Sequence, residues 1–89
     1  MKKEPSPIAM QIIALLNNIV ELVEQSNDRK QAKDVMQALV IYAAGKNYSL
    51  PESKIQVFNH MLLDSRPNTI SSIVKSIAHE VLQKDIENQ

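Results

Sequence analysis

Helix-start signals recur along this 89-residue sequence, and each one precedes apolar residues at helical spacing. Ser6 can cap a helix that has Pro7 at its first position, where a missing N–H costs nothing. Asp28 with Gln31, and Ser49 with Glu52, have the spacing of capping boxes. Pro67 breaks the pattern once more, because the residue before proline disfavours the helical region. The sequence therefore predicts four helices, over about 6–25, 28–44, 50–64 and from 68 to about 83.

The composition fits one small folded domain. The chain is 44% apolar and has one Gly and four Pro, whereas disordered chains are poor in aliphatic residues. We predict an all-α fold, a small bundle of about four helices in a single domain over 1–89. Gly45 is expected to end the second helix in the left-handed conformation. Residues 1–6 and 84–89 are expected to be disordered or frayed.

The apolar residues exceed what a small bundle can bury. The stripe of the first predicted helix is wider than a surface helix needs, and nothing charged occurs between Ala38 and Lys46. Large exposed apolar patches mark association surfaces, and two-fold dimers are the commonest oligomers. We therefore expect a homodimer whose interface uses the first helix and the second half of the second helix. The candidates, for that surface or for the core beneath it, are Ile12, Leu16, Ile19, Val23, Leu39 and Tyr42.

The sequence lacks catalytic motifs. It has no Cys, so a thiolate nucleophile and a Cys-based zinc site are excluded. His60 and His79 are the candidate base or metal-ligand side chains, but neither belongs to a zinc-binding helix motif or lies beside a nucleophile elbow. We expect no enzyme, no cofactor and no metal. The expected function is that of a small regulatory or adaptor protein that binds itself and another protein chain.

A second interpretation is a helix-turn-helix-like DNA-binding regulator that uses residues 54–82. In it the last helix presents Ser71, Ser72, Lys75 and His79 to the nucleic acid. The ten basic and ten acidic residues cancel, however, whereas DNA-binding domains usually carry a basic excess. Nucleic acid is therefore a possible partner but not the favoured one.

Prolines and polar residues interrupt the apolar run that follows the charged N-terminus. Pro5, Pro7 and Gln11 lie within the stretch that a signal peptide would use for its apolar region. We therefore expect neither a signal peptide nor a membrane span, and the absence of Cys agrees with a cytoplasmic location.

The stretch from Asp34 to Leu82 resembles the YmgB/AriR group of small enterobacterial regulators. Three segments carry the resemblance: a helix ending at Ala43-Ala44-Gly45-Lys46-Asn47, the run Ile55-Gln56-Val57-Phe58-Asn59-His60-Met61-Leu62, and the run Ile73-Val74-Lys75-Ser76-Ile77-Ala78-His79-Glu80-Val81-Leu82. The resemblance implies a cytoplasmic, dimer-forming bacterial protein in biofilm or stress signalling, without catalytic residues. The wide first helix and the Ser49–Glu52 cap depart from that group. A bacteriocin or toxin immunity protein is a further alternative, since such proteins are also small, helical and act by binding.

Overall fold

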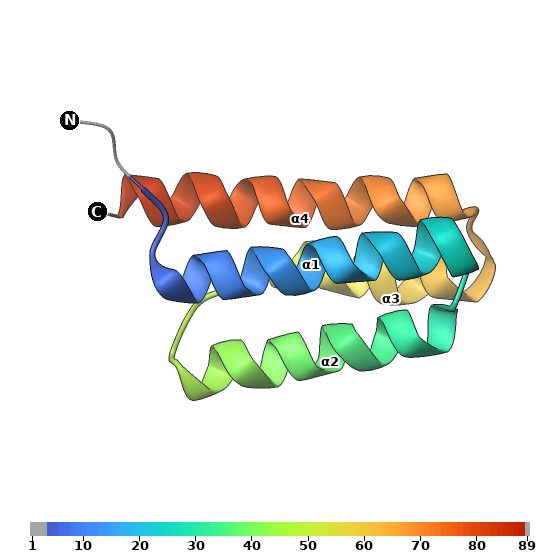
Figure 1. Ribbon diagram of the computed structural model, residues 1–89, viewed down its shortest axis with the longest axis horizontal. Helices are drawn as coiled ribbons and strands as arrows, with labels where there is room; N and C mark the ends of the chain where they lie inside the picture. Colours follow the sequence, from blue (N-terminus) through green and yellow to red (C-terminus); the bar gives the residue numbers. More distant parts are fainter. Residues whose placement is uncertain (1–3, 89) are drawn as a thin grey trace.

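The computed structural model describes residues 4–88 and contains four helices that run alternately up and down (Figure 1). They are α1 (Pro7–Ser26), α2 (Arg29–Gly45), α3 (Glu52–Asp64) and α4 (Pro67–Glu87). No strand occurs in the described residues. The predicted all-α class and the number of helices are confirmed.

Local signals in the sequence fix the ends of α1 and the start of α2. The Ser6 side chain accepts a hydrogen bond from the Ala9 N–H, and the Asp28 side chain accepts one from the Gln31 N–H. Asn27 adopts the left-handed conformation between the two helices, with φ of 49°. An asparagine tolerates this conformation better than most residues, so a link of two residues suffices to reverse the chain.

Two predicted helix ends differ in the structure. Gly45 has no positive φ; Asn47 takes the left-handed conformation instead, with φ of 56°. The capping box from Ser49 does not form either, since α3 begins later, at Glu52, after Pro51 and without a side-chain cap. Proline has its φ preset for a helix start, so α3 begins directly after Pro51 rather than after Ser49.

The predicted fraying from Lys84 is wrong, because α4 stays helical to Glu87. Asp85 in its last turns is buried and accepts hydrogen bonds from the chain just before α1. Of the expected disorder over 1–6, residues 1–3 lie outside the described part, while Ser6 is held by Asp85. The likewise predicted disorder of Gln89 lies outside the described part as well.

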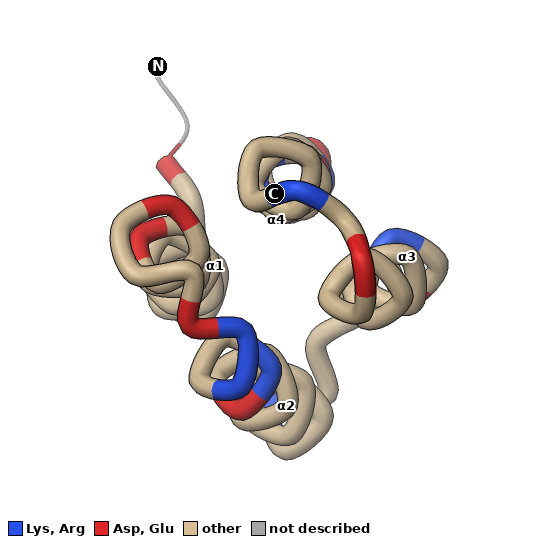
Figure 2. The backbone as a smooth tube through the Cα atoms, turned by 90° about the vertical axis from the view of Figure 1, so that its right-hand side faces the viewer, with Lys and Arg blue, Asp and Glu red and all other residues tan. Residues whose placement is uncertain are grey.

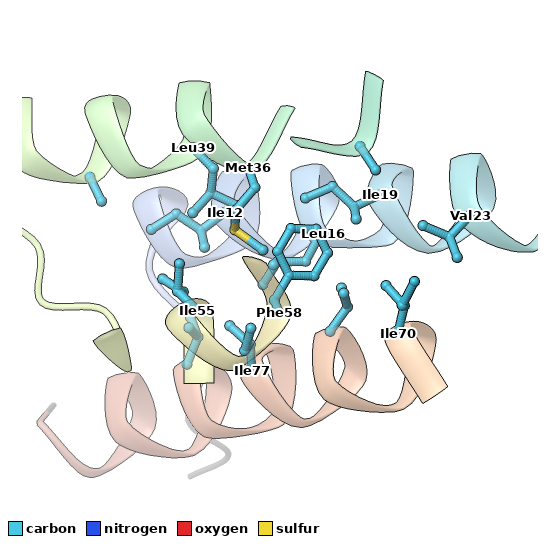
Figure 3. Close-up of a cluster of buried hydrophobic side chains, with 14 of the residues drawn as sticks. Ile12, Leu16, Ile19, Val23, Met36, Leu39, Ile55, Phe58, Ile70 and Ile77 are labelled. Carbon is cyan, nitrogen blue, oxygen red and sulfur yellow. The ribbon is translucent and has the colours of Figure 1, made fainter. Parts of the chain in front are cut away.

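The helices pack unevenly around the bundle. Helix α1 contacts both α2 and α4 extensively and α3 packs against α4, whereas α2 and α3 barely touch (Figure 2). The core follows this arrangement, with Phe58 projecting from α3 among side chains of the other helices (Figure 3). Phe58 is the largest fully buried side chain. Burying a side chain of this size contributes about 1.5–3 kcal/mol.

Candidate protein-binding surface

The residues predicted for the interface lie mostly in the core of the single chain. Ile12, Leu16, Ile19 and Val23 of α1 and Leu39 of α2 are fully buried, and only Tyr42 is half-buried. The reason is that α1 packs between α2 and α4, so its wide apolar stripe faces two neighbours within the monomer. The sequence left open whether these residues belong to the interface or to the core. The structure places these five residues in the core.

The second half of α2, in contrast, is largely uncovered within the single chain. We expected this uncharged stretch to take part in the interface, and within one chain Ala38, Val40, Ile41 and Ala44 are all exposed. Ile41 is 72% exposed and Val40 is 38% exposed. An apolar surface of this kind, on a part of α2 that has no charge from Val35 to Gly45, is typical of an association surface.

A hollow of about 570 Å³ opens between this stretch of α2 and the beginning of α3. Val40, Ala43 and Ala44 line it from α2, and Leu50 and Ile55 from the other side, while Glu52 and Gln56 belong to its polar part. The two alanines leave room because their side chains are too short to reach α3. We call this hollow, with its extension along α3, the α2–α3 groove.

The extension is a second hollow of about 340 Å³ on α3, lined by Gln56, Asn59, His60 and Leu63. Gln56 lines both hollows. Leu63 is 81% exposed, the highest value among the large apolar side chains of the described residues. The sequence did not single out Leu63, because spacing alone does not show which side of α3 lacks a neighbour.

Hydrogen bonds define both ends of the α2–α3 groove. At one end the Arg29 Nη1 donates to the Leu62 carbonyl at 3.3 Å, which joins the start of α2 to the end of α3. At the other end the loop between α2 and α3 is held by Tyr48, whose hydroxyl donates to Asp85 Oδ1 at 3.0 Å. Both walls of the groove are thus fixed at their ends and open along their length.

Asp85 is the centre of a buried polar cluster that the sequence interpretation missed. Its two carboxylate oxygens accept from the Ser6 N–H at 2.7 Å, from the Ser6 hydroxyl at 2.8 Å and from the Tyr48 hydroxyl. Burial, followed by the hydrogen bond and the charge of Asp85, raises the pKa of Tyr48 to about 12. This Ser6–Tyr48–Asp85 cluster connects the start of α1, the α2–α3 loop and the end of α4.

Three cations cluster at the start of α2, next to the Leu62 end of the groove. Arg29, Lys30 and Lys33 lie within five residues, and the first turn of α2 has no acidic residue. None of the three belongs to an ion pair within residues 4–88. Positive side chains are disfavoured at a helix N-terminus, where the helix dipole is itself positive. Nearby, Asp28 is used in capping the helix.

The residues predicted to contact nucleic acid do not share one exposed face. Ser71 is buried, and its hydroxyl has no hydrogen-bond partner among the described residues. It lies on the buried stripe of α4, three residues before Val74, whereas the sequence interpretation presented it to the nucleic acid. Ser72, Lys75 and His79 are exposed. The Lys75 ammonium lies 3.5 Å from a Glu24 carboxylate oxygen, which partly neutralises the one cation of that face.

The other charged contacts hold α3 to α4. Lys54 Nζ lies 3.0 Å from Glu80 and donates to the Ser76 hydroxyl. The hydrogen bond from Lys54 holds the pKa of Glu80 below its usual value. Within residues 4–88 no three His, Cys, Asp or Glu side chains gather as a metal site would require.

Helix α1 is long and apolar enough to cross a membrane, by its length and composition. The core helix of a soluble protein has the same properties. In this chain a stripe of α1 is buried against α2 and α4.

Comparisons with known protein families, with curated proteins and with solved structures find no match to this chain.

Proposed function

We propose that this chain is a small non-enzymatic regulatory or adaptor protein that acts by binding other protein chains, including a second copy of itself. The observation that carries this proposal is the exposed apolar surface formed by the second half of α2. Ala38 and Ile41 have no partner helix on their outer side, and Val40 and Ala44 lie beside them at the edge of the α2–α3 groove.

Self-association through α2 would remove Ile41 from water. Each Å² of apolar surface removed from water contributes about 25 cal/mol, so covering the exposed part of a few aliphatic side chains in each of two chains favours association. In a two-fold dimer each contact between the copies occurs twice, because the symmetry repeats it. The small residues around Ile41 let a second helix approach closely.

The test is the mass of the protein by light scattering after size exclusion, over a roughly hundredfold dilution. We expect a dimer that dissociates on dilution and that Ile41→Glu turns into a monomer. Ile41 is 72% exposed, so the glutamate is solvated in the monomer and the fold is retained.

Met10→Glu is the matched control, since Met10 is an apolar residue of α1 with 58% exposure. It introduces the same charge on a helix whose apolar stripe is already used in the core. A dimer that Met10→Glu disrupts and Ile41→Glu leaves intact would place the interface on α1 and contradict the assignment to α2. A wild-type protein that is monomeric at all concentrations would contradict self-association.

A further inference from the structure

We infer that the α2–α3 groove is a docking site for an amphipathic helix of another protein, whose acidic end lies against Arg29, Lys30 and Lys33. The inference rests on the proposed function, since it names the partner class for one surface of a protein-binding domain. It differs from self-association because it uses the side of α2 that faces α3 and not the outer side around Ile41.

The shape of the α2–α3 groove fits a helix. The two walls are antiparallel helices that barely contact each other, and their ends are fixed by the Arg29 bond to the Leu62 carbonyl and by the Tyr48–Asp85 bond. A third helix can pack between them by the same ridge-into-groove contacts that hold the rest of the bundle. The described residues have no sheet edge, so an extended peptide has no backbone groups to pair with.

The groove has apolar contacts along its length. Val40, Ala44 and Ile55 lie in the larger hollow, and Leu63 lies in the smaller one beside the Leu62 end. Grooves of this type select helices whose apolar residues recur at i, i+3, i+4 and i+7. The alanines of α2 leave space for large side chains, so leucine, isoleucine or phenylalanine is expected in the partner's stripe.

Charge determines which amphipathic helix fits. Arg29 is held beside the end of α3 by its bond to the Leu62 carbonyl, and Lys30 and Lys33 follow within about one turn of α2. These cations have no ion-pair partner in the described chain and occupy the helix end where positive charge is least favourable. A carboxylate of a partner helix would supply the missing ion pair and would offset the unfavourable positive charge at the start of α2. Glu52 lines the opposite end of the groove, which disfavours acidic residues there.

The test uses two synthetic helical peptides of about 18 residues, which span about 27 Å. Both have the same leucine stripe; one has glutamates and the other has lysines in its first two turns. Binding to the full-length, isotope-labelled protein is followed by NMR. The acidic peptide should shift the signals of Val40, Gln56 and Leu63, and should bind at least about tenfold more tightly than the basic peptide at low salt.

Charge reversal in the protein should reverse the preference. The double variant Lys30→Glu/Lys33→Glu should weaken the acidic peptide by about tenfold or more and should favour the basic peptide. Lys75→Glu is the control, since this lysine is also exposed but lies on α4, and it should leave both affinities unchanged. Leu63→Ser should weaken both peptides alike. Lys33 and Leu63 are exposed, so these variants are expected to fold.

Three results would overturn the inference. The first is no shift at the groove with the acidic peptide up to about 1 mM. The second is equal affinity for both peptides, which would remove the role of the cations. The third is displacement of the dimer by the peptide, because the groove would then be covered by a second copy. Light scattering on the same samples reports self-association separately, so failure of the docking site and failure of the proposed self-association give different results.

Discussion

Replacement of Asp85 should destabilise the whole bundle, although this residue lies four positions from the end of the chain. Asp85 is 8% exposed, and its carboxylate accepts hydrogen bonds from the Ser6 N–H, the Ser6 hydroxyl and the Tyr48 hydroxyl. A hydrogen bond to a charged group contributes about 1.5–3 kcal/mol to stability. These hydrogen bonds are only partly buried, so in a variant water can replace some of the hydrogen bonds that are lost.

From these contacts we expect Asp85→Asn to lower the free energy of unfolding by about 1.5–3 kcal/mol, because the amide keeps one acceptor oxygen and turns an N–H₂ group toward a donor. Asp85→Ala removes every acceptor and should cost about 3–4 kcal/mol. A domain of this length has a total stability of about 4–13 kcal/mol, so either loss is a large fraction.

The assay is urea unfolding followed by circular dichroism, with hydrogen exchange to locate the effect. Exchange should accelerate first in the last turn of α4 and the first turn of α1, which Asp85 joins. Asp34→Asn is the matched control, since Asp34 is exposed on α2 and makes none of the side-chain hydrogen bonds found in residues 4–88. If Asp85→Asn cost no more than Asp34→Asn, the cluster would not stabilise the fold and the reasoning would be refuted.

Three further predictions concern stability. Because the folded pKa of Tyr48 is about 12 and its usual value is 10.0, unfolding free energy should fall as pH rises from about 10 to 12, and Tyr48→Phe should abolish that fall in alkaline urea titrations. The pKa of Glu80 is lowered, so its contribution to stability is present above the usual value of 4.5 and is lost as pH falls through the folded value. Lys54→Met should reduce this acid dependence to the part that Lys84 supplies, and added salt should weaken it. Ile19→Ala should cost about 2–5 kcal/mol in urea unfolding, as expected of a core residue, while an unchanged midpoint would place Ile19 outside the core.

The sequence predicted the helices well because their signals are local. Ser6 and Asp28 cap helices through atoms three residues away, and Pro67 begins α4 at its first position. Such contacts depend only on neighbours in the chain, so they can be recognised without knowledge of the fold. The capping box at Ser49 failed because Pro51 also supplies a helix start, and two local signals competed for the same turn.

The surface could not be predicted in the same way, because exposure depends on which helices become neighbours. An apolar stripe looks the same in the sequence whether it faces the core, as at Leu16, or solvent, as at Ile41. Likewise Asp85 is a charged residue near a chain end, and only its contact with Ser6, 79 positions away, shows why it is buried. Its one local signal is its place four residues after Val81, on the buried stripe of α4.

The opening between α2 and α3 follows from how this chain distributes its large side chains. The branched aliphatic residues of α1 and α4 fill the space between those two helices, and the single Phe fills the centre. On α2 the positions toward the end of the helix are alanines, and α3 has only 13 residues against 17 in α2. Short side chains facing a short helix cannot close an interface, so the groove remains although the rest of the bundle is tightly packed. A larger side chain from Ala44→Leu should therefore fill the groove without lowering the free energy of unfolding, and should at the same time block a docked helix. Unfolding and peptide binding measured on this variant would show separately what the groove contributes to stability and to binding.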